Sequence, residues 1–221
     1  MRGKIVKGIA GFYYVSTEAG TVECKARGNF RNRRITPFVG DDVEIEIQDE
    51  EKLTGNIVDV AERSNYLLRP SVANVSLAVL VFAATKPEPA LNLLDRLLVH
   101  MAIRNVETII VFNKCDLISE TRRQELADCY AGSGRKVMFI SAKNWLNTDG
   151  LTAELKGKTS VLAGPSGVGK STLMNLLLPT AQMETGSISE KIDRGKHTTR
   201  HSELFRIDED TFVMDTPGFS S

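Results

Sequence analysis

The sequence predicts a small all-β barrel of the OB-fold type, followed by an α/β domain with a mostly parallel sheet. In the first 60 or so residues, short runs alternate apolar and polar side chains between glycine-containing turns, which indicates half-buried strands. Further along, apolar runs alternate with segments of helical spacing, the pattern of parallel strands joined by helices. We expect the barrel at residues 1–64, a linker at 65–74 and the α/β domain at 75–221.

The barrel prediction depends on five short strands. Their expected ranges are 4–9, 13–17, 21–26, 42–48 and 55–60. In 42–48, Val43, Ile45 and Ile47 alternate with Glu44 and Glu46, so one face of this strand is apolar and the other is acidic. An SH3-like barrel would show almost the same pattern, and it stays open as the alternative.

Charge is unevenly distributed along a chain whose formal net charge is zero. Residues 25–34 carry five positive charges and no acid, whereas residues 41–51 carry seven acids and no base. Small barrels often bind RNA through basic loops and aromatic rings. The residues that we expect to contact RNA are Lys25, Arg27, Phe30, Arg31, Arg33 and Arg34. Alternatively, the charged run forms a solvated face, and the aromatic ring of Phe30 fills the barrel.

Composition is that of an ordinary globular protein, with 42% apolar and 25% charged residues. The N-terminus lacks the apolar core of a signal peptide, and no apolar run reaches the length of a membrane span. We therefore expect a cytoplasmic protein without membrane contact. Cys24, Cys115 and Cys129 form no C-x-x-C pair, so neither a disulfide framework nor a zinc knuckle is predicted.

The α/β domain is predicted from alternating apolar strands and amphipathic helices. Strands are expected at 76–83, 108–112, 136–140, 159–163 and 211–214, with 202–207 paired to the last in a hairpin. Helices are expected at 90–103, 119–131, 148–155 and 172–178. Residues 180–200 are polar and are expected to form a long loop.

A phosphate-binding loop is predicted where G-x-x-x-x-G-K-S lies between an expected strand and an expected helix. Its glycines allow backbone N–H groups to surround phosphates, and the helix N-terminus adds a favourable dipole. Lys170 would reach the terminal phosphates, and the Ser171 hydroxyl would bind Mg²⁺. The predicted nucleotide contacts here are Gly164, Pro165, Ser166, Gly167, Val168, Gly169, Lys170, Ser171 and Thr172.

Two further motifs indicate recognition of a guanine base. Asn113-Lys114-x-Asp116 follows an apolar strand, and the Asp116 carboxylate would accept hydrogen bonds from the ring N–H and the exocyclic amine of guanine. Adenine lacks this pair of donors, which would leave the carboxylate unpaired. Asn113 would brace the site and the Lys114 stem would lie over the base. After the next strand, Ser141, Ala142 and Lys143 would supply a backbone N–H to the guanine oxygen.

The order of the motifs is unusual. Asp215-Thr216-Pro217-Gly218 fits the Mg²⁺ side and the γ-phosphate contact of a nucleotide switch, so Asp215 is expected to act on the metal and Gly218 on the phosphate. Ordinary GTPases carry the phosphate loop first and the base motifs last. Here the base motifs precede the phosphate loop, which indicates a circular permutation.

The barrel, this motif order, Gly195-Lys196-His197-Thr198-Thr199-Arg200 and D-T-P-G-F together resemble the bacterial ribosome small-subunit-dependent GTPase A family. The resemblance covers essentially the whole chain. It implies a permuted P-loop GTPase domain, GTP and GDP as ligands, and a monomer that acts late in maturation of the small ribosomal subunit and its rRNA. It also implies GTP hydrolysis stimulated by that subunit. The family continues into a C-terminal zinc domain, so we expect a C-terminally truncated chain without the zinc ligands.

The resemblance also assigns roles around the first switch. Thr199 is expected to bind Mg²⁺, with Thr198 as the alternative. Phe219 stands where many GTPases have the glutamine that orients the attacking water, so slow intrinsic hydrolysis is expected. His197 is the candidate substitute, against an exposed loop histidine. The predicted catalytic set is thus Lys170, His197, Thr199 and Gly218.

Two other functions remain open. A nucleotide-gated RNA-binding module with incidental turnover is the alternative that Phe219 favours. A permuted GTPase of the large subunit is disfavoured by the N-terminal barrel.

Overall fold

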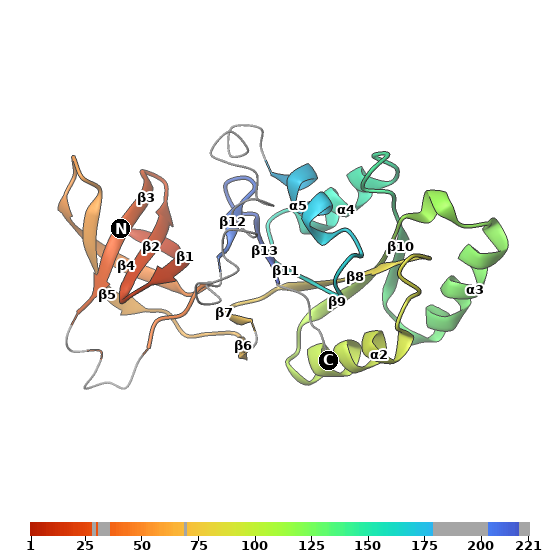
Figure 1. The fold of residues 1–221 in the computed structure, drawn as a ribbon. Coiled ribbons are helices and arrows are strands. Elements are labelled where there is room, and N and C mark those ends of the chain that lie inside the picture. The colour runs from red at the N-terminus through yellow and green to blue at the C-terminus, as the bar shows by residue number, and fades with distance from the viewer. Residues whose placement is uncertain (28–29, 31–35, 69, 179–202, 217–221) are drawn as a thin grey trace. The chain divides into compact units, whose positions relative to one another are not determined.

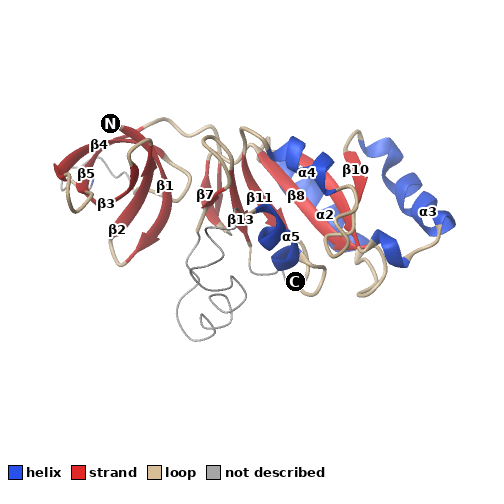
Figure 2. Ribbon diagram, turned by 90° about the horizontal axis from the view of Figure 1, so that it is seen from above, coloured by secondary structure: helices blue, strands red, loops and turns tan. Residues whose placement is uncertain are grey.

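The computed structural model describes residues 1–27, 30, 36–68, 70–178 and 203–216. Two compact units divide the chain (Figure 1). The first holds residues 1–75 and the described residues 203–205, and the second holds 76–178 and 206–216. As Figure 2 shows, the first unit consists of strands, and in the second unit helices flank a sheet.

The first unit is built around a closed barrel in the order β1-β2-β3-β5-β4, with β4 returning to β1. Neighbouring strands are antiparallel except β3 and β5, which run parallel. The strands are β1 (Arg2–Ile9), β2 (Phe12–Thr17), β3 (Gly20–Ala26), β4 (Asp42–Asp49) and β5 (Thr54–Val60). Each differs by at most a few residues from the predicted range, and the OB-fold prediction is confirmed.

The alternation in β4 decides which face of the strand enters the core. Val43 and Ile45 are buried, while Glu44 and Glu46 are exposed. Gly55 of β5 lies so close to this strand that a Cβ would come within 2.6 Å of the Glu46 carbonyl oxygen. A glycine is therefore needed where the two backbones meet.

Phe30 corrects one sequence prediction. Its side chain is only 2% exposed and belongs to the buried apolar set of the barrel unit. A base cannot stack on a ring that is covered on both faces, so Phe30 is not an RNA contact in this conformation. The sequence predicted an exposed Phe30 because its neighbours in the chain are basic. Burial of the apolar ring was the stronger effect.

The segment expected as a linker contains a small hairpin, which was not predicted. β6 (Tyr66–Leu68) pairs antiparallel with β7 (Ser71–Ala73). The Ala73 N–H donates to the Val39 carbonyl at 2.8 Å, so this hairpin is bonded to the chain just before β4. A Cβ on Gly40 would lie 2.1 Å from the Ala73 carbonyl oxygen, so the close approach requires glycine, whose φ here is +91°.

The second unit contains a six-stranded sheet in the order β10-β9-β8-β11-β13-β12, whose edge strand β12 starts at Phe205, the last residue assigned to the first unit. All strands from β10 to β13 in this order run parallel. The strands are β8 (Leu77–Ala83), β9 (Glu107–Asn113), β10 (Lys136–Phe139), β11 (Thr159–Ala163), β12 (Phe205–Arg206) and β13 (Phe212–Asp215). β8 and β11 are buried at every position, as strands covered on both faces must be.

Helices cover both faces of this sheet (Figure 1), with α2 on one side and α4 and α5 on the other. The helices are α2 (Leu91–Ile103), α3 (Glu120–Tyr130), α4 (Thr148–Leu155) and α5 (Lys170–Leu177). Short 3-10 turns follow β9 at η1 (Cys115–Leu117) and α3 at η2 (Ala131–Ser133). Ser119 caps α3 as predicted, because its hydroxyl accepts the Arg122 N–H at 3.2 Å.

The path of the chain through the sheet reverses next to β8. The chain enters at β8, moves outward through β9 and β10, and then returns to β11 on the other side of β8. Crevices for ligands in open α/β sheets form where the strand order reverses, outside the carboxyl ends of the strands. In this unit that point lies between β8 and β11. Each predicted nucleotide motif in the described chain follows the carboxyl end of a strand on this side of the sheet.

Candidate nucleotide site

The phosphate loop joins β11 to α5, and its glycines are required by their surroundings. Gly164 has φ +153°, and a Cβ there would lie 2.0 Å from the Val81 carbonyl oxygen of β8. Gly169 has φ +97°, and its Cβ would lie 2.4 Å from the Asn113 amide nitrogen. The loop therefore approaches two neighbouring strand ends more closely than any side chain would allow.

Lys170, the first residue of α5, is 7% exposed and lies within this loop. Its ammonium donates to the Gly164 carbonyl at 2.9 Å and to the Pro165 carbonyl at 2.8 Å. Burial lowers the pKa of Lys170, while the charge of Asp215 opposes that shift. The loop thus holds a buried cation that carbonyl dipoles neutralise only in part.

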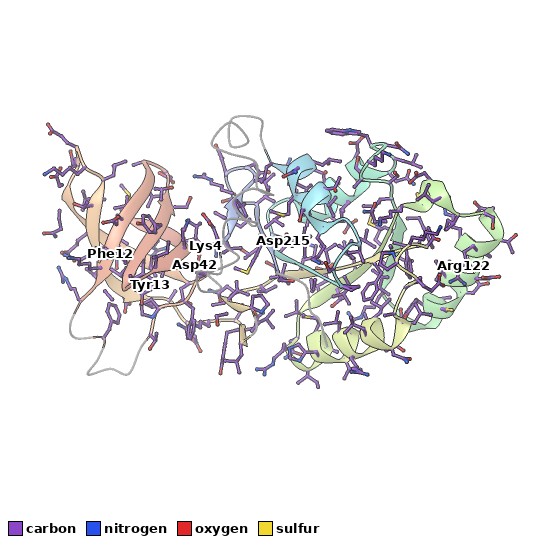
Figure 3. The ribbon with its side chains drawn as sticks, in the orientation of Figure 1. Lys4, Phe12, Tyr13, Asp42, Arg122 and Asp215 are labelled. Carbon is purple, nitrogen blue, oxygen red and sulfur yellow. The ribbon has the colours of Figure 1, made fainter. Side chains whose placement is uncertain are left out.

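Asp215 ends β13 and carries an unusual carboxyl group (Figure 3). Its Oδ1 atom is buried and accepts no hydrogen bond from the described residues. Burial raises the pKa of this carboxyl to about 6, although the charge of Lys170 works in the opposite direction. A buried carboxylate oxygen without a donor is a poor structural element and a good ligand for a hard cation.

Asn113, the last residue of β9, connects three segments and is 3% exposed. Its amide nitrogen donates to the Val168 carbonyl of the phosphate loop at 2.9 Å. Its Oδ1 accepts the N–H of Lys114 at 2.8 Å and that of Ala142 at 3.0 Å. One side chain therefore ties both base motifs to the phosphate loop.

Lys114 extends this connection. The backbone of Lys114 is left-handed, with φ +63°. In that conformation its N–H donates to the side-chain Oδ1 of Asn113. Its ammonium donates to the Gly167 carbonyl at 2.8 Å and to the Lys86 carbonyl, in the loop after β8, at 2.6 Å. The lysine stem therefore spans the space between the base motif and the phosphate loop.

Asp116 lies in η1 with an exposed side chain. Its Oδ2 accepts a hydrogen bond from the Asn144 amide at 3.0 Å. Asn144 directly follows Ser141-Ala142-Lys143 and was not singled out by the sequence. The only indication of Asn144 in the sequence was its position, one residue after a recognised base motif.

Several predicted site residues lie outside the described residues. These are His197, Thr199 and Gly218 of the catalytic set, together with Arg31, Arg33 and Arg34 of the basic run. Among the remaining RNA candidates, the Lys25 ammonium lies 4.9 Å from the centre of the Phe12 ring, and Arg27 pairs with Glu46 on the surface.

Neither a metal-binding cluster nor a membrane-spanning helix occurs in the described part of the chain. Across the described residues, no three His, Cys, Asp or Glu side chains gather in a way that could hold a metal ion. In the same part of the chain, no helix combines the length and the apolar character needed to cross a bilayer.

Comparison with known proteins decides the family. The profile of the RsgA GTPase matches residues 60–221, and that of the RsgA N-terminal domain matches residues 2–57. The chain belongs to the RsgA GTPase family. The predicted family and the predicted fold class are both confirmed.

Curated RsgA relatives are similar over the entire chain. A protein of Agathobacter rectalis named small ribosomal subunit biogenesis GTPase RsgA is 51% identical, and the alignment covers 100% of this chain and 77% of the relative. A relative of the same name from Alkaliphilus metalliredigens is 47% identical, with 100% and 75% covered. The chain thus spans about three quarters of the length of these RsgA proteins.

Solved structures agree with this assignment. The crystal structure of YjeQ from Thermotoga maritima has a TM-score of 0.81 at 35% identity, covering 99% of this chain and 75% of that one. YloQ, whose structure is described as a circularly permuted GTPase, has a TM-score of 0.77 at 36% identity, covering 100% and 72%. The permutation predicted from motif order in this RsgA family member is confirmed.

Proposed function

We propose that this chain binds and hydrolyses GTP as a factor in late maturation of the small ribosomal subunit. The observation that carries the proposal is the Asn113 side chain, which joins the base motif to the phosphate loop at 2.9 Å. This hydrogen bond fixes the spacing between the base motif and the phosphate loop, so that one nucleotide can contact both. The relatives named small ribosomal subunit biogenesis GTPase support the biological role.

Guanine would be read by Asp116 and by one backbone amide. The carboxylate is exposed and can accept the two donors of the guanine edge. Within the described chain, the N–H groups of Ser141, Ala142 and Asn144 already have partners, at Leu146 O, Asn113 Oδ1 and Ser141 Oγ. The Lys143 N–H is therefore the amide that we assign to the guanine oxygen.

The phosphates would lie against the backbone N–H groups between Gly164 and Ser171, at the N-terminus of α5. Lys170 is held beside them and would turn from its carbonyl partners to the more strongly negative terminal phosphates. The Ser171 hydroxyl and the unpaired Asp215 Oδ1 fit a magnesium ion, with Thr199 as a third proposed ligand. When bound, Mg²⁺ would neutralise charge that develops on the phosphates.

Hydrolysis by the chain alone is proposed to be slow, because Phe219 replaces the water-orienting glutamine. His197 and Gly218 are the proposed catalytic residues of this step, and both lie outside the described part of the chain. We propose that the small subunit accelerates hydrolysis by placing these residues beside the phosphates.

Contact with rRNA is proposed for the barrel, the unit matched by the N-terminal family profile. A hollow of about 300 Å³ lies on its surface, lined by the β1–β2 turn, by Phe12 and Tyr13, and by Pro37, Phe38 and Val39. Phe12 and Tyr13 are labelled in Figure 3. The Lys25 ammonium lies over the ring of Phe12, one of the lining residues. Aromatic rings beside a cation suit stacked bases and a phosphate backbone.

GTP turnover with and without purified small ribosomal subunits tests the proposal. We expect turnover to rise by at least about tenfold with small subunits and to stay at its basal level with large subunits. Unchanged turnover with both, together with RNA binding that depends on GTP, would support the alternative of a nucleotide-gated RNA-binding module. Equal affinity for ATP and GTP would contradict the proposed GTPase function.

A further inference from the structure

We propose that Asn144 is a positioning residue that orients the Asp116 carboxylate and so helps to set the preference for guanine over adenine. The inference rests on the proposed function, because it assumes that Asp116 reads the base. It adds a residue outside the recognised motifs to that site. Its basis is the hydrogen bond from Asn144 Nδ2 to Asp116 Oδ2, 3.0 Å long.

The Asp116 side chain is otherwise weakly held. It is exposed, and among the described residues Asn144 is the hydrogen-bond partner that the structure gives its carboxylate. An exposed aspartate samples several rotamers, and its terminal torsion is broad. One donor on Oδ2 limits that freedom, so less entropy is lost when a base binds.

Asn144 itself is held by a rigid turn. Ser141 and Leu146 exchange two backbone hydrogen bonds of 3.0 Å each, which closes the turn around Asn144. The Asn144 N–H donates to the Ser141 hydroxyl at 3.3 Å. Just beyond, the Asn147 amide donates to the Phe139 carbonyl at 2.9 Å.

The turn also stores backbone strain. Trp145 has φ +58° and Asn147 has φ +59°. A left-handed conformation is tolerable for asparagine but unfavourable for tryptophan, so surrounding bonds must maintain it. Trp145 is also 69% exposed, so burial of its ring does not explain the strain. These two left-handed residues belong to the same turn that presents the Asn144 amide to Asp116.

The chemistry of the carboxylate permits both contacts at once. Each carboxylate oxygen offers about two lone-pair sites, so Oδ2 can accept Asn144 and still accept one donor from guanine. Oδ1 remains for the second guanine donor. Adenine does not present this donor pair, so the contribution of Asn144 appears with guanine nucleotides and not with ATP.

Two variants test the proposal. Asn144→Ala removes the donor, and Asn144→Asp replaces it with a carboxylate of nearly the same shape that repels Asp116. We expect GTP and GDP affinity to fall roughly three- to tenfold in the first, which is the cost of ordering one side chain on binding, and further in the second. ATP affinity and kcat at saturating GTP should not change, whereas KM for GTP should rise.

The controls separate positioning from folding and from net charge. Asn92→Asp adds the same charge on the exposed face of α2, and it should leave all affinities unchanged. In an Asp116→Ala background, Asn144→Ala should have no further effect on GTP binding, because the residue acts through Asp116. Calorimetric titration measures every affinity, and thermal unfolding checks that each variant is folded.

The outcomes distinguish this inference from the function beneath it. A wild-type protein that prefers GTP while Asn144→Ala keeps the same GTP-to-ATP ratio would overturn the positioning role alone. Tighter GTP binding by Asn144→Ala would also overturn it, since the amide would then compete with the base. A wild-type protein that binds ATP and GTP equally would overturn the proposed function and this inference together.

Discussion

The amide of Asn113 donates to the backbone carbonyl of Val168, so the last residue of β9 is bonded to the phosphate loop that follows β11. The two residues are 55 positions apart. β8 lies between their strands, and the loop crosses its end at Gly164. The base motif and the phosphate loop are therefore joined in one site, although the base motif comes first in the sequence.

Asn113→Ala should separate these two motifs. It leaves the Val168 carbonyl and the Ala142 N–H without a partner in a buried site, at a cost of about 2–4 kcal/mol of unfolding free energy. GTP affinity should fall at least about tenfold, because the loops are no longer held at a fixed spacing. Urea unfolding and calorimetric titration measure both effects, and the exposed Asn92→Ala is the matched control. Equal behaviour of the two variants would contradict the role given to Asn113.

Gly164→Ala should disrupt the phosphate loop through its backbone. The added Cβ would lie 2.0 Å from the Val81 carbonyl oxygen, and φ is +153°. We expect a loss of more than about 2 kcal/mol of stability and loss of GTP binding. Gly132→Ala, where a Cβ meets nothing within 4 Å, should be near neutral in the same unfolding and titration experiments. A Gly164→Ala protein of native stability would show that the close approach is not needed.

Asp215→Asn should change the pH dependence of stability in the absence of nucleotide and magnesium. The pKa of Asp215 is raised from 3.8 to about 6 in the folded protein, so the folded state binds more protons than the unfolded chain between those values. Stability therefore falls as pH rises through this window and stays lowered above it. The variant should be more stable than wild type by roughly 1–3 kcal/mol at pH 7.5 and by less at pH 4.5. Urea unfolding at both pH values measures the difference, and a gap that does not depend on pH would refute the burial argument.

Arg63→Ala should destabilise the barrel unit. Arg63 donates to both carboxylate oxygens of Asp41, at 2.7 and 2.8 Å, and the Asp41 side chain is fully buried. Removal of Arg63 leaves a buried carboxylate without its cationic partner, although the Phe38 N–H still donates to it, at a cost of about 2–4 kcal/mol. Arg27→Ala, which breaks the exposed pair with Glu46, should cost at most about 1 kcal/mol. Chemical unfolding followed by circular dichroism compares the two, and equal losses would contradict the distinction.

Local pattern was enough to place most elements and motifs. Val43 and Ile45 alternate with acids, and β8 and β11 are continuous apolar runs, so burial of apolar area left little choice of conformation. The motifs at Asn113 and Gly164 were identified because each follows such a run directly. The permutation followed from their order alone.

Tertiary contacts decided what the sequence could not. Phe30 looked like a surface aromatic among basic residues, but the barrel unit buries it. The β6–β7 hairpin was missed because three-residue strands have almost no periodicity, and contacts with Val39 and Gly40 hold it. Asn144 was missed because its partner, Asp116, is 28 residues away.

The most direct test of the guanine site is to reverse its base preference. Asp116→Asn replaces one carboxylate oxygen by an N–H donor, which would face the exocyclic amine of guanine unfavourably but would donate to the oxygen that xanthine carries there. Dissociation constants for GTP and xanthosine triphosphate, measured by calorimetry on wild type and variant, should show a preference for GTP in the first and for xanthosine triphosphate in the second, each by about tenfold or more. A variant that keeps the wild-type preference, or a wild type that binds both nucleotides equally, would contradict the assignment of Asp116 as the residue that reads the base.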